Sequence, residues 1–203
     1  GLMLYSAHQQ IPAQSKGYGA STYDGKPLEE SGAKPSDLSD EQKAFLKDDN
    51  LRAVLITKVQ SPEIAAQWNN NVQAYVEGLG HGIPANNSSD PRHETTANAE
   101  YNYGAGGNIS QWPTSLGLYL QDNSPELVKQ FGQIAAKEYR ALGITTALSP
   151  QVDLASEPRW TRFTGTFGGD PDLTTDLGRA YIDGFQTSEG EAEIADGWGY
   201  ESV

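Results

Sequence analysis

Two serine-proline-glutamate tripeptides, at residues 61–63 and 124–126, constrain the fold of this chain most strongly. In each, serine is a good N-cap, proline suits the first helical turn because its missing N–H is not needed there, and glutamate meets the positive end of the helix dipole. Apolar residues at helical spacing follow both tripeptides. Short apolar runs flank the two segments and are typical of buried strands. The sequence therefore predicts alternating strands and helices.

The same signals recur along the chain. Strands are predicted at residues 1–5, 51–57, 83–87 and 144–148. Helices are predicted to begin at Ser39, with Gln42 at capping-box spacing, at the two tripeptides, and at Asp170-Pro171. Residues 6–36 and 88–111 are interpreted as polar loops, and residues 190–203 as an acidic, turn-rich end. The predicted buried helix faces are Ile64, Trp68, Val72, Tyr75, Val76 and Leu79; Leu127, Phe131, Ile134, Ala135 and Leu142; and Leu173, Leu177, Ala180, Tyr181 and Phe185.

Each helix is long enough to cross back over a sheet, so neighbouring strands should be parallel. Two α/β architectures fit this order: an open doubly wound sheet, or a (β/α)8 barrel. Charged loops follow the strands, as on the catalytic face of a barrel. The chain has no glycine-rich dinucleotide fingerprint and no phosphate-binding Walker loop, which weakens the nucleotide-binding open sheet. A complete barrel needs about 250 residues, so the chain is either a small open sheet or part of a barrel.

Composition excludes several classes of partner and site. The net charge is −13, with 14 basic against 27 acidic residues, and no basic stripe exists that could displace counterions from a nucleic acid. The absence of cysteine excludes disulfides and thiolate metal sites. His81 and His93 lack metal-ligand spacing, so neither a metal nor a cofactor is expected. No run approaches 18 apolar residues, and we expect no membrane span.

The loop at residues 149–171 joins the fourth predicted strand to the last helix. It carries two arginines, Arg159 and Arg162, together with Trp160 and three carboxylates. A long connection with this charge density is more often functional than not.

Segments of this loop and of the preceding loops match a known pattern. They are Pro-Arg-Trp-Thr-Arg at residues 158–162, Phe-Gly-Gly-Asp-Pro at 167–171, Asp-Pro-Arg-His at 90–93 and Trp-Pro followed by Gly-Leu at 112–118. Their combination resembles glycoside hydrolase family 3, the exo-acting β-glucosidases and β-xylosidases. The resemblance covers about residues 80 to 187.

The resemblance implies that residues 1–203 are the first half of a (β/α)8 TIM-like barrel, incomplete in this chain. The family's barrel is followed by an α/β sandwich domain. The remainder of the same polypeptide, or a companion chain, would complete the barrel. The family's Lys-His pair and nucleophilic aspartate lie beyond the segments matched here, and none of the three histidines, His8, His81 and His93, follows a lysine. We therefore expect no catalytic residue within this chain. The resemblance also implies a secreted or periplasmic location, although the first residues lack signal-peptide features.

The resemblance assigns sugar binding to Asp90 and Arg162. Carboxylates and guanidinium groups suit this role because they form charge-assisted, often bidentate, hydrogen bonds to adjacent hydroxyls. Two structural alternatives stay open: Asp90 caps a turn beside Pro91, or Arg162 pairs with Asp153 or Glu157.

The other candidates are more evenly divided. His93 either contacts the sugar or orients Asp90. Arg159 is a further substrate-binding candidate, and its alternative is an ion pair with a carboxylate. Trp160 is expected to pack beneath the loop, Asp170 to cap the last helix, and Trp112 to pack in the core or line the pocket.

Three departures from the family pattern leave the sugar preference open. Thr161 replaces a glycine, Gly165 stands where many members carry glutamate, and Gly169 replaces the acid before Asp170. The predicted activity is retaining hydrolysis of terminal β-D-glucosyl residues, which uses two carboxylates about 5–5.5 Å apart. The alternatives are a β-xylosidase and a non-catalytic carbohydrate-binding protein on the same scaffold.

Overall fold

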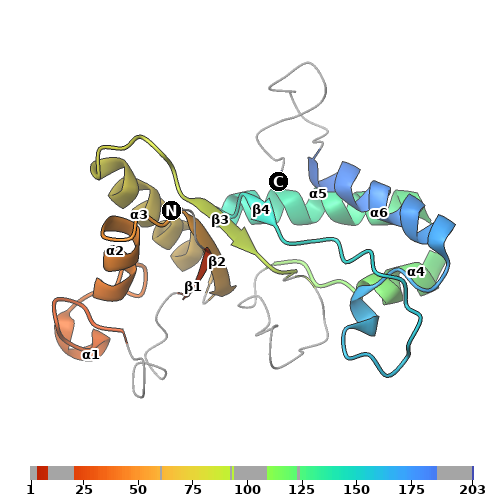
Figure 1. Ribbon diagram of the computed structural model, residues 1–203, viewed down its shortest axis with the longest axis horizontal. Coiled ribbons are helices and arrows are strands. Elements are labelled where there is room, and N and C mark those ends of the chain that lie inside the picture. Colours follow the sequence, from red (N-terminus) through yellow and green to blue (C-terminus); the bar gives the residue numbers. More distant parts are fainter. Residues whose placement is uncertain are drawn as a thin grey trace. The chain divides into compact units, whose positions relative to one another are not determined.

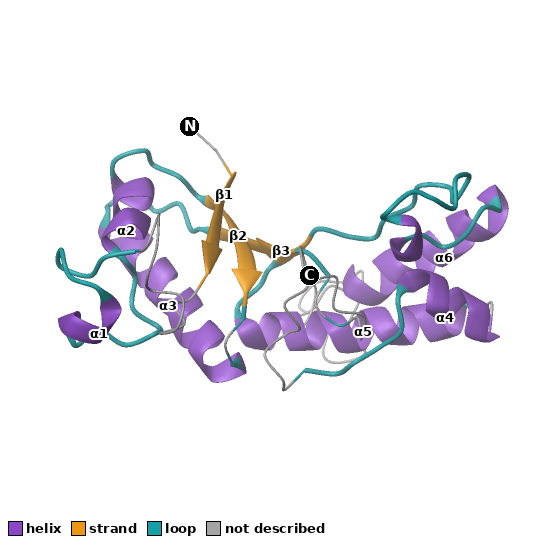
Figure 2. Ribbon diagram, turned by 90° about the horizontal axis from the view of Figure 1, so that it is seen from below, coloured by secondary structure: helices purple, strands orange, loops and turns teal. Residues whose placement is uncertain are grey.

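The protein is an α/β structure with a parallel sheet, as the sequence predicts (Figures 1 and 2). The computed structural model describes residues 4–8, 21–59, 61–91, 93, 109–122, 124–186 and 203. The strands are β1 (Leu4–His8), β2 (Ala53–Lys58), β3 (Asn86–Ser89) and β4 (Thr146–Ala147), in sheet order β1-β2-β3-β4. The pairs β1–β2 and β2–β3 are parallel. The helices are α1 (Leu28–Ser31), α2 (Asp40–Lys47), α3 (Pro62–Gly78), α4 (Ser115–Asp122), α5 (Pro125–Leu142) and α6 (Pro171–Gln186), and a short 3-10 helix, η2, covers Phe163–Gly165.

The described residues form two compact units. Unit 1 comprises the described residues up to Asp90 and residues 141–146. Unit 2 comprises the remaining described residues, from Pro91 onward. The predicted loop region at residues 94–108 and the acidic end at 190–202 lie outside the described residues.

Helix starts in unit 1 follow the predicted capping chemistry. Gln42 N–H donates to the Ser39 hydroxyl at 3.2 Å and Ser39 N–H donates to Gln42 Oε1 at 3.0 Å, which completes the capping box of α2. The Ser61 hydroxyl accepts from Ile64 N–H at 3.2 Å at the start of α3. Trp68 of α3 is fully buried and donates from Nε1 to Gln42 Oε1 at 3.3 Å, and this bond joins α3 to α2. The two helices lie on the same side of the sheet (Figure 2).

The third strand lies later in the chain than predicted. The prediction of residues 83–87 is wrong at its start, because Ile83 is 55% exposed and β3 begins at Asn86. Polar residues form the buried strand instead: the hydroxyls of Ser88 and Ser89 donate to the carbonyls of Val54 and Ile56, both at 2.9 Å. Buried hydroxyls are tolerated when they are hydrogen-bonded. A search for apolar runs cannot find such a strand.

The other strand boundaries are shifted by a few residues. Residues 1–3 of the first predicted strand lie outside the described residues, and β1 covers Leu4–His8, so it ends three residues later than predicted. The second strand, β2, begins two residues later and ends one residue later than predicted. The fourth strand is shorter than the predicted residues 144–148, since β4 covers Thr146–Ala147. Leu148 after it is 42% exposed, whereas Ile144, two residues before it, is fully buried.

In unit 2, α5 and α6 pack side by side (Figure 1). The predicted inner faces are confirmed for Phe131 on α5 and for Leu177, Tyr181 and Phe185 on α6, all buried. Leu127 and Ile134 are only half-buried. Tyr139, which the prediction omitted, is 1% exposed. One aromatic cluster consists of the rings of Phe131, Tyr139, Tyr181 and Phe185, and the ring centroids of Tyr181 and Phe185 stack 4.7 Å apart.

Two short helices were not predicted. The four-residue α1 lies within the segment interpreted as a loop, and α4 begins at Ser115 after Trp112-Pro113. Thr114 starts α4 by accepting Gly117 N–H on its hydroxyl at 3.1 Å. Within the described part of the chain, no helix combines the length and apolar character needed to cross a membrane.

Candidate functional site

Asp90 lies directly after the carboxyl end of β3, as predicted, and is half-buried. The hydroxyl bonds of Ser88 and Ser89 fix the strand that leads to it. Active sites of barrel enzymes are built at the carboxyl ends of parallel strands. The position of Asp90 therefore suits a site residue, while its sugar-binding role stays a prediction.

The charged loop between β4 and α6 is braced by its own backbone. A series of turns leads into η2, and each turn is closed by a backbone hydrogen bond. Trp160 N–H donates to Glu157 O at 3.1 Å, Phe163 N–H donates to Trp160 O at 3.0 Å, and Gly165 N–H donates to Arg162 O at 3.1 Å. The Gln151 side chain donates to the same Arg162 carbonyl at 3.1 Å. Ala155 N–H donates to Gly168 O at 2.9 Å and closes the base of the loop. The loop thus has a defined course despite its length.

Arg159 forms the ion pair that was its structural alternative. Its Nε and Nη2 donate to the two Glu157 oxygens, both at 2.8 Å, and its backbone N–H donates to Oε1 at 2.9 Å. These bonds lower the pKa of Glu157 to about 2 and raise the pKa of Arg159. The Arg159 side chain is 88% exposed, so water screens the pair and it stabilises the fold little.

Arg162 is exposed and differs from Arg159 in its surroundings. Among the described residues, Arg162 forms no ion pair with Asp153 or Glu157, and Glu157 pairs with Arg159 instead. The Arg162 backbone is nevertheless held by the bonds to its carbonyl. A guanidinium on a fixed backbone suits ligand binding, and this role of Arg162 also stays a prediction.

A surface depression of about 600 Å³ lies within this loop. Its lining residues are Asp153, Leu154, Ser156, Glu157, Arg159 and Trp160. Trp160, expected beneath the loop, is half-buried and lines this depression. Arg159 is therefore at the depression and Arg162 is not among its lining residues.

Asp170 acts as the predicted helix cap. Its Oδ1 accepts from Leu173 N–H at 2.9 Å, and its carbonyl accepts from Thr174 N–H at 3.0 Å at the start of α6. Trp112 packs edge-on against Phe131, with ring centroids 5.3 Å apart. Both residues thus have the structural roles that the sequence indicated.

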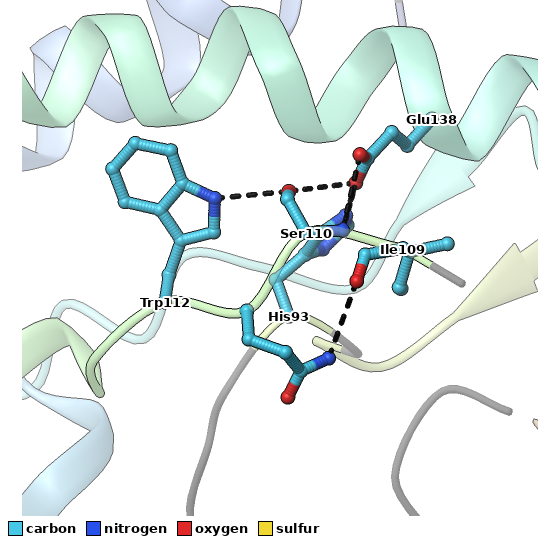
Figure 3. Close-up of polar contacts among 6 residues, drawn as sticks. His93, Ile109, Ser110, Trp112 and Glu138 are labelled. Carbon is cyan, nitrogen blue, oxygen red and sulfur yellow. Dashed lines mark hydrogen bonds and ion pairs between the residues drawn. The ribbon is translucent and has the colours of Figure 1, made fainter. Parts of the chain in front are cut away.

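His93 is buried, with 1% exposure, and its ring lies against Phe131 and Tyr139 at centroid distances of 5.9 and 5.2 Å. Its Nε2 is 2.7 Å from Oε2 of Glu138 on α5 (Figure 3). Burial lowers the pKa of His93, and the nearby Glu138 charge opposes that shift. The Nε2 atom is therefore engaged by Glu138, while any action of His93 on Asp90 stays a prediction.

Glu138 is the residue that the sequence prediction missed. Besides His93, its carboxylate accepts from the Ser110 backbone N–H at 3.1 Å and from the Ser110 hydroxyl at 2.8 Å (Figure 3). The Ser110 hydroxyl in turn accepts from Trp112 Nε1 at 2.9 Å. One signal was present: an acid seven positions after Phe131 falls on the apolar face of a helix. Of the described residues, no group of three or more histidines and carboxylates is placed to hold a metal ion.

The sequence profile of the glycosyl hydrolase family 3 N-terminal domain matches residues 23–196. The chain belongs to this family. It is 45% identical over 129 residues to a periplasmic β-glucosidase/β-xylosidase of Dickeya chrysanthemi, which covers 64% of the chain and 19% of the relative. It is 44% identical over 133 residues to β-glucosidase C of Emericella nidulans, which covers 65% and 21%. The chain thus spans about a fifth of the length of these curated relatives.

A family 3 fold is also found among solved structures. A mutant β-glucosidase from Listeria innocua, in complex with laminaribiose, superposes with a TM-score of 0.54 and 28% identity. The match covers 68% of this chain and 16% of that one. The family assignment made from the motifs is confirmed.

Proposed function

We propose that this chain is part of an exo-acting, retaining β-glycosidase that removes terminal β-D-glucosyl residues from glucosides or short glucans. One observation carries the proposal: the family 3 match at residues 23–196 contains Asp90, His93, Arg159 and Arg162. The names of the two relatives support the glucoside substrate. The laminaribiose in the Listeria structure supports short glucans.

The proposal includes a barrel that this chain begins. The described strands follow one another in the sheet without a reversal of order, whereas doubly wound sheets reverse at a switch point. This order supports the first half of a (β/α)8 barrel. The rest of the polypeptide or a companion chain would supply the remaining strands, the nucleophilic aspartate and the acid/base residue. The periplasmic Dickeya relative supports a secreted or periplasmic location.

In this proposal Asp90 and Arg162 hold hydroxyls of the terminal sugar in the −1 subsite. The nucleophile attacks the anomeric carbon while the acid protonates the leaving oxygen, and water then hydrolyses the glycosyl-enzyme intermediate. Rigid sugar binding favours both steps because it keeps the anomeric carbon in line with the nucleophile. Arg159 is the weaker arginine candidate, because Glu157 already occupies its guanidinium.

Hydrolysis of 4-nitrophenyl β-D-glucopyranoside by the full-length protein tests the activity, and proton NMR of the first-formed sugar anomer tests retention. Arg162→Gln should lower kcat/KM by about 10- to 100-fold, since a charge-assisted hydrogen bond contributes about 1.5–3 kcal/mol. Arg159→Gln is the matched control, from the same loop and with the same charge change, and should lower it far less. A protein that binds glucosides but hydrolyses none would be the non-catalytic alternative.

A β-xylosidase is the second candidate, because the Dickeya relative carries both activities in its name. Thr161, which replaces a glycine of the family pattern, lies between Trp160 and Arg162. The ratio of kcat/KM for the 4-nitrophenyl β-glucoside and β-xyloside decides between the two sugars.

A further inference from the structure

We infer that Glu138 is a positioning residue of the proposed sugar site: its carboxylate fixes the ring of His93, a candidate sugar-binding residue. This inference rests on the proposed function, because it gives Glu138 a role in the same site. All the contacts that carry it lie within unit 2.

The hydrogen bonds of Glu138 determine which nitrogen of His93 carries hydrogen. A carboxylate can only accept hydrogen bonds. The Nε2 of His93, 2.7 Å from Oε2, must therefore be the donor. A neutral ring in this arrangement is the Nε2–H tautomer, with Nδ1 as an acceptor. Burial of the ring favours the neutral form.

His93 is held at two points. Glu138 holds the ring, and the Trp112 backbone N–H donates to the His93 carbonyl at 2.6 Å. Phe131 and Tyr139 restrict the ring on its other sides. The backbone and the ring of His93 are therefore both fixed within unit 2.

The energetics favour a positioning role over a stabilising one. The Glu138 side chain is 28% exposed, whereas His93 is buried among aromatic rings. Replacing a buried ionic network by apolar residues of similar volume is often neutral or stabilising. What such a network does instead is orient its groups, since hydrogen bonds weaken steeply when their angles depart from the preferred range.

Oε2 of Glu138 is the acceptor on which His93 depends. It accepts from His93 Nε2 and from both the hydroxyl and the backbone N–H of Ser110, and Oε1 also accepts from Ser110 N–H. In Glu138→Gln, an amide oxygen at the Oε2 position keeps the bond from His93 Nε2. Glu138→Leu offers His93 no acceptor.

The test compares Glu138→Leu and Glu138→Gln with Glu126→Leu in the full-length protein. Glu126 lies in the exposed first turn of the same helix, where its carboxylate accepts from the Ser124 hydroxyl at 3.0 Å. Each variant loses one negative charge from α5. Long-range proton–nitrogen NMR of protein labelled with nitrogen-15 in its histidines reports the tautomer of His93. The His93→Gln variant identifies the His93 signal, because that signal is missing from its spectrum. Steady-state hydrolysis of 4-nitrophenyl β-glucoside reports kcat and KM.

We expect His93 to be Nε2–H in the wild type and in Glu138→Gln, whose kcat/KM should stay near the wild-type value because the amide oxygen keeps the bond. Glu138→Leu should lower kcat/KM by about 10- to 100-fold, because small misplacements of binding groups have effects of this size. Glu126→Leu should match the wild type in both measurements. If Glu138→Leu melts below the assay temperature, Glu138→Asp replaces it, since aspartate is one methylene shorter and should also lower kcat/KM.

Each adverse result has a separate meaning. Wild-type kcat/KM in Glu138→Leu, a loss in Glu138→Gln equal to that in Glu138→Leu, or an Nδ1–H ring in the wild type overturns the positioning role and leaves the proposed glycosidase standing. Absence of hydrolysis by the wild-type protein overturns the proposed function itself.

Discussion

Gly184→Ala should separate α5 from α6, because two glycines let the backbones of these helices touch. A Cβ at Gly184 would lie 2.3 Å from the Lys129 carbonyl oxygen and 2.9 Å from Gly132 Cα. Both contacts are with backbone, so no side-chain rotation can relieve them. Ordinary contact needs about 1 Å more than the shorter distance. The two helices must therefore move apart or bend.

The magnitude follows from two opposing effects. Overpacking of this kind destabilises by about 1–3 kcal/mol, and rigid backbone on both sides places Gly184→Ala near the upper end. Alanine in place of glycine favours a helix by about 1 kcal/mol. The net loss is about 2 kcal/mol of stability, which raises the equilibrium population of the locally opened state about 30-fold.

Amide hydrogen exchange on the full-length protein, followed by mass spectrometry of peptides from residues 125–142 and 171–186, measures this opening. Gly178→Ala on the same helix is the control. Its added Cβ meets only Val152 Cγ1, at 3.0 Å, and Val152 is 52% exposed and can rotate away. Gly178→Ala should leave exchange unchanged or slow it. Wild-type protection in Gly184→Ala, or equal loss of protection in both variants, would refute the argument.

Further predictions concern His93, two glycines and an exposed ion pair. Burial lowers the pKa of His93, so the unfolded chain binds more protons: the stability contribution is complete above the unfolded pKa of about 6.5 and is lost as pH falls toward the folded pKa. Urea titrations of His93→Gln should therefore show a flatter pH dependence between pH 7 and 5, by at most about 1.4 kcal/mol per pH unit. Gly143→Ala combines a φ of +82° with a Cβ 2.7 Å from Asn69 Cβ. It should lower the melting temperature more than Gly25→Ala, which has a φ of +75° and no neighbour within 4 Å. Glu157→Gln breaks an exposed pair and should leave the melting temperature unchanged.

The parts of the fold that the sequence predicts well are those decided within a few residues. Ser39, Ser61 and Asp170 each accept a backbone hydrogen bond from three positions ahead, so the signal and its partner lie in one turn. The glycine within α4 lowers helix propensity and hides that helix, even though Thr114 supplies its first hydrogen bond.

Features decided by distant partners were not predictable. Glu138 bonds to His93 from 45 positions away and to Ser110 from 28, and nothing local marks these pairs. Arg159 and Glu157 are only two residues apart, and the alternatives drawn from the sequence included pairing of Arg159 with a carboxylate, without naming Glu157 as that carboxylate. Sequence motifs identified the family, whereas the network behind His93 required the structure.

The polar character of β3 has a consequence for Asp90. Apolar burial is non-directional, so a strand held only by apolar contacts is not fixed along its axis by them. The hydroxyls of Ser88 and Ser89 bond to particular carbonyls of β2, and a one-residue slip of β3 would turn both hydroxyls away from them. Hydrogen bonds depend strongly on distance and angle, so these bonds fix the register of β3. Asp90 is the next residue, and its position at the end of the strand is set by the same bonds.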